Sequence, residues 1–257
     1  MSEARPGNLG VYDLRGRVAV VTGGSNGIGA ATVRRLAAAG ARCVVGYNHG
    51  SDRAAALIAE LPGSGHVALR MPMEDSAALR AAAAEVEARF GRCDVLVNSA
   101  ATTRAVPHAD LEALDDALID RVLVANVRGP FATIRALAPL MRRSGDGAII
   151  NISSVAAISG TGSSIIYGAS KAALDTMGRS LARVLGPEIR VIGISPSAVQ
   201  TGFVPGRSRE VVEKQAAASP LQRVTEADDV AVAIIGAITH FRLTTGSTIL
   251  VDGGKHL

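Results

Sequence analysis

The sequence predicts an α/β fold, in which one parallel β-sheet lies between two layers of helices, and two observations support this. Short runs rich in β-branched residues alternate with longer segments of helical apolar spacing along nearly the whole chain. The 257 residues are 48% hydrophobic, but only 3% are aromatic and Trp is absent. The core must therefore consist of Ala, Val, Leu and Ile, which is typical of a parallel sheet covered by helices.

Seven segments are predicted to be strands, and in chain order they are residues 17–22, 41–46, 66–69, 93–97, 148–153, 190–194 and 248–251. Helical spacing fills the segments between them: residues 28–39, 51–61, 76–90, a long tract ending at Arg142, a helix that carries Tyr167, and residues 227–238. Strands joined through helices pair in parallel, so we expect a single doubly wound, seven-stranded parallel sheet with helices on both faces.

No repeat, low-complexity linker or second domain interrupts this pattern. Residues 1–12 are predicted to be a flexible N-terminal tail, and residues 13–257 to form one domain. A mobile loop is expected at about residues 202–219, after the sixth strand.

Charge and composition argue against several other classes of protein. The formal net charge of +4 comes from Arg residues scattered through the chain, so we expect no nucleic-acid partner. No segment has the ~18 uninterrupted apolar residues of a membrane span, and the N-terminus lacks the apolar core of a signal peptide. Cys43 and Cys93 are far apart and lack metal-ligand spacing. The sequence therefore predicts a reduced cytoplasmic protein without a metal site.

The first predicted strand ends in the segment Thr22-Gly-Gly-Ser-Asn-Gly-Ile-Gly29, which leads directly into the first helix. Glycine lets a ligand approach the backbone closely, and the N–H groups at a helix N-terminus attract phosphate. A tight turn without a ligand is the alternative when this segment is considered alone. We predict that it binds the pyrophosphate of a dinucleotide through Gly23, Ser25, Asn26, Gly27, Ile28 and Gly29.

Tyr167 and Lys171 are four residues apart in a predicted helix, so their side chains share one face. The usual pKa of a tyrosine is about 10, which is too high for efficient acid–base catalysis at neutral pH. A neighbouring ammonium group favours the phenolate, so we expect Lys171 to lower the pKa of Tyr167. The pair is interpreted as a proton-transfer device.

These motifs, together with Ser154 after the fifth strand and Asn126 in the preceding long helix, resemble the short-chain dehydrogenase/reductase family over nearly the whole chain. Considered alone, Ser154 would be interpreted as a turn serine and Asn126 as a residue that kinks a helix. The resemblance instead implies a Rossmann-type domain with a catalytic tetrad, which consists of Asn126, Ser154, Tyr167 and Lys171.

The resemblance also implies a mechanism. Ser154 and Tyr167 would hydrogen-bond the substrate carbonyl oxygen while hydride moves from the nicotinamide to the carbonyl carbon, and Tyr167 would supply the proton. Lys171 would hold the nicotinamide ribose and help to keep the phenol acidic. Asn126 would shape a water-filled proton path to Lys171.

Further cofactor contacts are implied by the same resemblance. Asn98 would tie neighbouring strands together, and Ala100 would line the adenosine ribose. Met73 would face the adenine through its backbone only, because the acidic residue that relatives commonly have there is missing. The turn after the sixth strand would approach the nicotinamide through Pro196, Val199 and Thr201, although Ser197 replaces the family's glycine in this turn.

The end of the second strand favours NADP(H) over NAD(H). Tyr47 stands where NAD-dependent relatives usually have Asp, and an acidic residue there would hydrogen-bond the ribose 2′-hydroxyl of NAD. Asn48, His49 and Ser51 would instead bind the 2′-phosphate of NADP, with Arg53 as a further partner. Asn26 departs from this pattern, because many NADP-dependent relatives have a basic residue at that position, so NAD(H) stays possible.

Among family members, the chain most broadly resembles 3-oxoacyl-(acyl carrier protein) reductases. We therefore expect NADPH-dependent reduction of a 3-oxoacyl-type or other small ketone, by a homotetramer. The basic residues Arg207, Arg209 and Lys214 would either meet an acidic carrier protein or form a solvated helix face. Two alternatives stay open: an NAD-dependent alcohol or sugar dehydrogenase, and a non-catalytic NADP-binding regulator.

Overall fold

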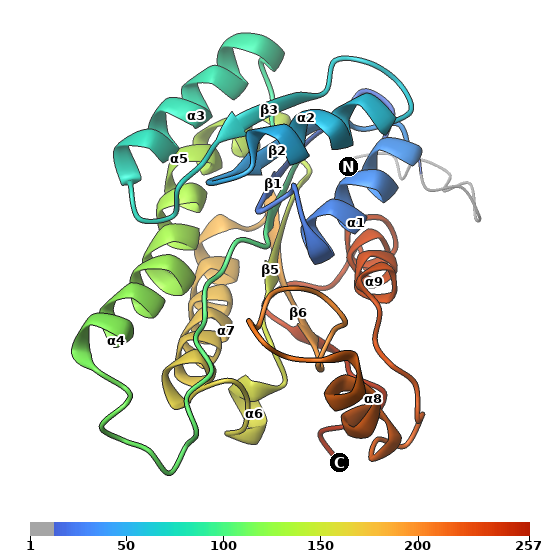
Figure 1. Ribbon diagram of the computed structural model, residues 1–257. Helices are drawn as coiled ribbons and strands as arrows, with labels where there is room; N and C mark the ends of the chain where they lie inside the picture. The colour runs from blue at the N-terminus through green and yellow to red at the C-terminus, as the bar shows by residue number, and fades with distance from the viewer. Residues whose placement is uncertain (1–12) are drawn as a thin grey trace.

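The structure is a computed structural model that describes residues 13–257, and its centre is one parallel sheet (Figure 1). The seven strands have the spatial order β3-β2-β1-β4-β5-β6-β7. The doubly wound parallel sheet predicted from the sequence is confirmed, and the observed strands are β1 (Val18–Thr22), β2 (Arg42–Tyr47), β3 (Val67–Arg70), β4 (Val95–Asn98), β5 (Gly147–Ile152), β6 (Ile189–Pro196) and β7 (Thr248–Val251).

The order in which successive strands are added to the sheet reverses at β1. Val21 of β1 pairs with Val45 of β2 on one side and with Val97 of β4 on the other. The chain builds outward from β1 to β3, then returns to place β4 on the opposite side of β1. Connections that leave on opposite sides open a crevice at the carboxyl ends of these strands, where such sheets bind ligands.

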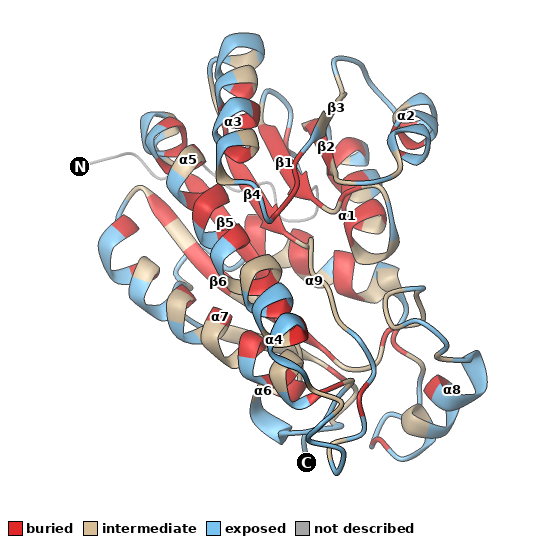
Figure 2. Ribbon diagram, turned by 60° about the vertical axis from the view of Figure 1, so that its left-hand side comes forward, coloured by how far each residue is buried: buried red, intermediate tan, exposed pale blue. Residues whose placement is uncertain are grey.

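Two layers of helices bury the two faces of the sheet, as Figure 2 shows. One face is covered by α1 (Gly27–Ala38), α2 (Ser51–Glu60) and α9 (Ala227–Thr239). The other is covered by α3 (Ser76–Phe90), α5 (Gly129–Ser144) and the C-terminal part of α7 (Ile165–Leu185).

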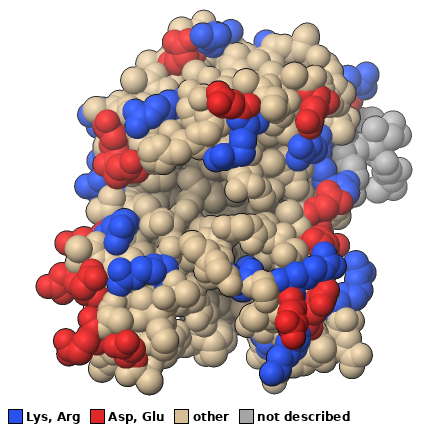
Figure 3. Space-filling model, viewed as in Figure 1, with Lys and Arg blue, Asp and Glu red and all other residues tan. Residues whose placement is uncertain are grey.

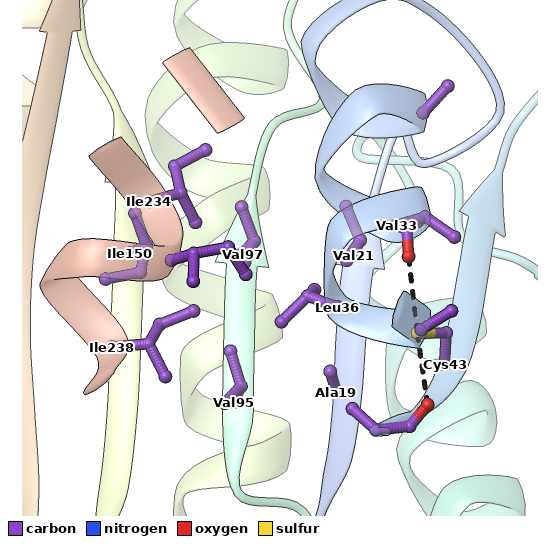
Figure 4. Close-up of a cluster of buried hydrophobic side chains, with 14 of the residues drawn as sticks. Ala19, Val21, Val33, Leu36, Cys43, Val95, Val97, Ile150, Ile234 and Ile238 are labelled. Carbon is purple, nitrogen blue, oxygen red and sulfur yellow. Dashed lines mark hydrogen bonds between the residues drawn. The ribbon is translucent and has the colours of Figure 1, made fainter. Parts of the chain in front are cut away.

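The first of these cores shows why the sheet is rigid. In Figure 4, Leu36 of α1 and Ile234 of α9 lie against Val21, Val97 and Ile150 of the three central strands. All five side chains are completely buried, with exposed fractions of 0%. Burial of large aliphatic side chains is worth about 1.5–3 kcal/mol each, so this packing holds the carboxyl ends of the central strands in place.

The long helical tract predicted before Arg142 is interrupted in the structure. It begins at α4 (Asp116–Leu123), passes through a π-helical turn (Val124–Arg128) and continues as α5. Asp115 fixes the beginning, since its carboxylate accepts a hydrogen bond from the Leu118 backbone N–H at 2.7 Å. Residues 99–115 are therefore loop and turn, and they pass beside the crevice.

Two short helices, α6 (Ala156–Ser159) and α8 (Arg209–Ala217), have no counterpart in the prediction. The segment 202–219, predicted as loop, contains α8, whose first turn is capped by Ser208 through the Val211 N–H at 3.4 Å. Only Val212 of α8 is buried, so its apolar spacing is too weak to be recognised from the sequence.

Three further observations concern the chain as a whole. The tail predicted at residues 1–12 lies outside the described residues. From residue 13 to the C-terminus, no helix is long and apolar enough to cross a membrane. The same part of the chain holds no group of three or more His, Cys, Asp or Glu side chains suited to a metal ion.

Candidate active site

A cavity of about 820 Å³ lies at the carboxyl ends of the central strands, and residues from both predicted motifs line it. In Figure 3 one face of the molecule is hollowed across its middle, and acidic and basic side chains are interspersed around the hollow. The cavity wall contains thirteen of the predicted site residues: Gly23, Ser25, Asn26, Gly27, Ile28, Tyr47, Asn48, His49, Met73, Ala100, Tyr167, Lys171 and Thr201.

The glycine segment between β1 and α1 is shaped by contacts that exclude any side chain. Gly23 has a φ of +63°, and a Cβ atom there would lie 2.9 Å from Cα of Ala100. A Cβ atom on Gly29 would lie 2.2 Å from the carbonyl oxygen of Gly23. Both glycines are therefore required by the packing of the loop against α1 and β4, which makes Gly29 a structural residue rather than part of the cavity wall.

The loop presents the N-terminus of α1 to the cavity. Asn26 caps this helix, because its Oδ1 accepts a hydrogen bond from the Gly27 N–H at 2.8 Å. Thr22 supports the loop from beneath, since its Oγ1 accepts hydrogen bonds from the N–H groups of Ser99 and Ala100, each at 3.1 Å. These hydrogen bonds fix the shape of residues 23–28, the glycine cradle, beside the cavity.

Asn98 lies just behind this cradle and joins two strands. Its Nδ2 donates to Oδ1 of Asn151 at 2.9 Å, which links β4 to β5. The side chain is buried and does not reach the cavity.

At one end of the cavity, Tyr47, Asn48 and His49 lie beside Arg53 and Glu74. Arg53 Nη2 donates to the His49 carbonyl at 3.0 Å, and Asn48 Nδ2 donates to Glu74 Oε1 at 3.2 Å. The sequence did not point to Glu74, which is the only carboxylate on the cavity wall among the described residues. Ser51 is the first residue of α2 and does not reach the wall.

On the opposite wall, α7 carries Tyr167 and Lys171. Lys171 Nζ lies 5.7 Å from the centroid of the Tyr167 ring and donates to the carbonyl of Ile152, at the end of β5, at 2.7 Å. Ser154 follows β5, and its Oγ accepts a hydrogen bond from the Ala156 N–H at 3.2 Å. Tyrosine, lysine and serine therefore meet where β5 ends, as the sequence predicts.

The acidity of the tyrosine differs from the expectation. Burial raises the pKa of Tyr167 to about 12, while a hydrogen bond with Ser154 and the charge of Arg207 oppose the rise. The expectation that Lys171 makes the phenol acidic is therefore wrong for this structure, because the ammonium group faces the Ile152 carbonyl and burial dominates. Burial also lowers the pKa of Lys171 to about 8, an effect that Asp175 opposes.

Asn126 lies in the π-helical turn and connects three elements. Its Oδ1 accepts from the Thr102 N–H at 2.8 Å, and its Nδ2 donates to the Thr102 carbonyl at 3.0 Å and to Ser170 Oγ at 3.1 Å. The side chain is 1% exposed. It fastens the loop after β4 to the helix that carries Tyr167, since Ser170 Oγ in turn donates to the Tyr167 carbonyl at 2.7 Å.

The segment after β6 closes the cavity on its remaining side. Thr201 and Phe203 line the wall, and the rings of Phe203 and Tyr167 are 5.8 Å apart between centroids. Val199 is 5% exposed and forms a bridge with Thr225, so it supports the wall from behind. Seven predicted site residues are thus not on the cavity wall: Gly29, Ser51, Asn98, Asn126, Ser154, Pro196 and Val199.

Several wall residues were not predicted. They come from the loop after β4, from α4 with its π-helical turn, and from the strand ends, and they include Ser99, Ala101, Thr102, Arg121, Val124, Ala125 and Ile152. Irregular loops carry no periodic signal, so only the tertiary structure places these residues at the site.

Comparisons with known proteins agree with this geometry. The family described as enoyl-(acyl carrier protein) reductase matches residues 23–256. The "Granaticin polyketide synthase putative ketoacyl reductase 2" of Streptomyces violaceoruber is 37% identical over 242 residues, which are 93% of this chain and 96% of that protein. A 3-oxoacyl-(acyl-carrier-protein) reductase of Staphylococcus aureus is 33% identical over 244 residues, 93% of this chain and 98% of that protein.

A solved structure is also similar over its full length. It is a short-chain dehydrogenase from Burkholderia cenocepacia in complex with NADP, with a TM-score of 0.87 and 34% sequence identity. The similarity covers 95% of this chain and 99% of that one.

Proposed function

The chain belongs to the short-chain dehydrogenase/reductase family and is a nicotinamide-dependent oxidoreductase acting on alcohol and carbonyl groups; from this membership we propose that it reduces a small ketone with NADPH. The observation that carries the proposal is one cavity wall that unites Tyr167 and Lys171 with the glycine cradle. The similarity to proteins named as ketoacyl and 3-oxoacyl reductases supports ketones as substrates, with 3-oxoacyl compounds first among them.

The residues of the cavity fit a nicotinamide dinucleotide. Gly23 packs so closely on the loop after β4 that a Cβ atom there would lie 2.9 Å from Cα of Ala100, so the backbone at this part of the wall carries no side chain. Gly23 to Gly27 would hold the pyrophosphate through backbone N–H groups. Met73 and Ala100 would face the adenosine, and Lys171 and Thr201 the nicotinamide half, supported by Pro196 and Val199.

Two features favour NADP over NAD. Tyr47, and not a carboxylate, stands on the wall at the end of β2, and Arg53 places a cation on the wall beside Asn48 and His49. Glu74 opposes this preference, because its carboxylate would repel a 2′-phosphate at the same end of the cavity. The NADP complex of the similar Burkholderia protein supports the choice of cofactor.

The proposed reaction needs a proton donor and a group that orients the carbonyl. NADPH, when bound, supplies the hydride. Tyr167 and Ser154 would hydrogen-bond the carbonyl oxygen, and Tyr167 would donate its proton to that oxygen as the alcohol forms. A phenol with a raised pKa keeps its proton at neutral pH, so the residue is in the donor form that reduction requires.

Cofactor titration tests this proposal directly. We would measure thermal stabilisation of the protein by NADPH and by NADH, which grows with occupancy of the folded state. A lower Kd for NADPH, together with oxidation of NADPH by 3-oxoacyl thioesters or simple ketones, is expected. A lower Kd for NADH would instead favour an alcohol or sugar dehydrogenase, and binding of neither would favour a regulator.

We also propose that the protein is a homotetramer. Large apolar side chains are exposed on α5 (Phe131, 41%), on α7 (Val184, 63%) and near the C-terminus (Leu243, fully exposed). The exposed apolar side chains on α5 and α7 agree with the subunit interface that the family resemblance implies for these two helices. Light scattering coupled to size-exclusion chromatography would give a mass four times that of the chain, and a monomer mass would contradict the proposal.

A further inference from the structure

Residues 202–221, the wall segment, connect the cavity wall to the outside of the molecule. Phe203 of this segment lines the cavity, and the chain then continues into α8. Within the wall segment only Val212 and Ser219 are buried. A segment with so little buried surface opens easily unless other parts of the chain hold it. The contacts that hold it therefore decide whether the cavity wall is complete.

The first part of the wall segment is held from the side of β6. The ring of Phe203 packs on Tyr167, with 5.8 Å between the ring centroids. Arg207 Nη2 donates a hydrogen bond to the Val199 carbonyl at 2.7 Å, and Val199 forms a bridge with Thr225. These contacts all lie before α8, so they do not hold that helix.

After β7 the chain folds into a closed turn, residues 252–257, which we call the C-terminal turn. The carboxylate of Asp252 is at its centre and is 6% exposed as a residue. It accepts hydrogen bonds from the N–H groups of Gly254 and His256, each at 3.0 Å, and from His256 Nδ1 at 2.7 Å. The Leu257 N–H donates to the Gly254 carbonyl at 3.1 Å. One buried carboxylate thus fixes the shape of the turn.

The C-terminal turn contacts the second part of the wall segment, and in Figure 1 the C-terminus lies beside α8. Lys255 Nζ donates to the carbonyl of Gln215, in the last turn of α8, at 3.3 Å. The Leu221 N–H donates to the Gly253 carbonyl at 3.0 Å. The end of the chain therefore holds both α8 and the residues that follow it.

Gly254 is the point of closest approach between the turn and the wall segment. Its φ is +84°, in the left-handed region that favours glycine. A Cβ atom there would lie 2.8 Å from Cγ of Pro220. A side chain at this position would therefore push the turn away from the wall segment.

We propose that the C-terminal turn is a positioning element of the substrate site: it holds α8 in place and thereby keeps Phe203 against Tyr167. No residue of the turn lies on the cavity wall, so the turn acts through the wall segment. This inference rests on the proposed function for the role of the wall in binding a ketone. When the wall segment is open part of the time, the apparent affinity for the ketone falls by the fraction that is closed.

Limited digestion with trypsin measures opening of the wall segment without any substrate. Arg209 and Lys214 are exposed residues of α8. A protease cleaves within a helix only after local unfolding, so the rate of cleavage follows the population of the open form. Gly254→Ala should raise the rate of cleavage after these two residues by about tenfold or more, because the new methyl group collides with Pro220.

Gly145→Ala is the matched control. Gly145 also has a positive φ, +75°, but nothing lies within 4 Å of the added methyl group. This variant should leave cleavage within α8 at about the wild-type rate. Cleavage after Arg80 and Arg89, which are exposed residues of α3, reports on opening elsewhere in the domain. Equal acceleration in α3 and α8 for Gly254→Ala would overturn the inference, and so would an unchanged rate in α8.

His256→Ala is a second variant that introduces no collision. It removes the hydrogen bond from Nδ1 to Asp252 and should accelerate cleavage in α8 by about threefold to tenfold. In this variant and in Gly254→Ala, we expect KM for a ketone to rise by about tenfold, with kcat and the Kd for NADPH within about threefold of wild type. Selective cleavage in α8 with an unchanged KM would overturn the positioning role, as would parallel losses in KM, kcat and NADPH binding.

Digestion and kinetics together separate this inference from the proposed function. If the wild-type protein oxidises neither NADPH nor NADH with any ketone, but Gly254→Ala still opens α8 selectively, the proposed function fails and the anchoring of the wall segment stands. If ketones are reduced and α8 does not open selectively in either variant, the inference fails alone.

Discussion

The two ends of the cavity are built in different ways. The cofactor end is a strand, a glycine loop and a helix that follow one another in sequence, and Gly23 and Gly29 are each required by a close backbone contact. The substrate end is assembled from the loop after β4, the π-helical turn and the segment after β6, which are distant in sequence. Local structure thus shapes the proposed dinucleotide site, while tertiary contacts shape the proposed substrate site.

The largest effect on binding is expected at the cofactor end, from Gly29→Ala. The new methyl group would lie 2.2 Å from the Gly23 carbonyl oxygen, so the loop must move away from α1. We expect the Kd for NADPH to rise by about a hundredfold and the free energy of unfolding to fall by about 1–3 kcal/mol, as for other overpacked sites.

Gly236→Ala is the control for that substitution. It also adds a methyl group to a helix, but nothing lies within 4 Å of the new atom. We expect unchanged NADPH binding and a slight stabilisation of about 0.5–1 kcal/mol from helix propensity. Normal NADPH binding by Gly29→Ala would show that the cofactor end is less constrained than the contacts indicate.

At the substrate end, Phe203→Ala should separate the two regions. The substitution removes the ring that packs on Tyr167. Phe203 lies on the cavity wall but is not part of the glycine cradle. We expect KM for a ketone to rise by about tenfold, roughly the loss of one buried aromatic contact, with the Kd for NADPH changed by less than about threefold. Steady-state kinetics would measure KM for the ketone, and calorimetry the Kd for NADPH. Similar rises in KM and in Kd would contradict the division of the cavity into two ends.

The pH dependence of kcat/KM for NADPH should be sensitive to Asp175. This residue accepts a hydrogen bond from Thr248 at 3.2 Å, and its charge opposes the lowering of the Lys171 pKa by burial. Because the pKa of Lys171 is lowered to about 8, the residue is charged below that pH and loses its charge as the pH rises through it. We expect kcat/KM for NADPH to fall above about pH 8. Asp175→Asn should move this fall to lower pH.

Thr248→Val provides the comparison, since it removes the hydrogen bond but keeps the carboxylate of Asp175. Its pH profile should stay close to that of the wild-type protein. If both variants shift the profile equally, packing rather than the charge of Asp175 sets the titration of Lys171.

The smallest effect is expected for Glu74→Gln at the far end of the cofactor site. Glu74 keeps its hydrogen bond with Asn48 through an amide oxygen but loses the charge that would repel a 2′-phosphate. The ratio of the Kd values for NADH and NADPH should rise by about threefold to tenfold, as for a solvent-accessible charge pair. An unchanged ratio would mean that Glu74 does not face the phosphate.

The same division explains what the sequence could predict. The succession of strands and helices, the glycine loop and the Tyr167–Lys171 spacing depend on local patterns, and the structure has all three. Glu74 and Arg207 carry no motif, and their positions depend on how distant segments pack. The direction of the Tyr167 pKa shift also depends on burial, which outweighs the nearby ammonium group that the sequence reveals.

The measurement that tests the account most directly compares the wild-type protein with Tyr167→Phe, at saturating NADPH and a ketone that the wild-type protein reduces. The substitution removes only the hydroxyl group that donates the proton. We expect kcat to fall by about 10² to 10⁴, the range for loss of a general acid, while the Kd for NADPH changes by less than about threefold. A Tyr167→Phe protein that retains most of its turnover would contradict the assignment of Tyr167 as the proton donor.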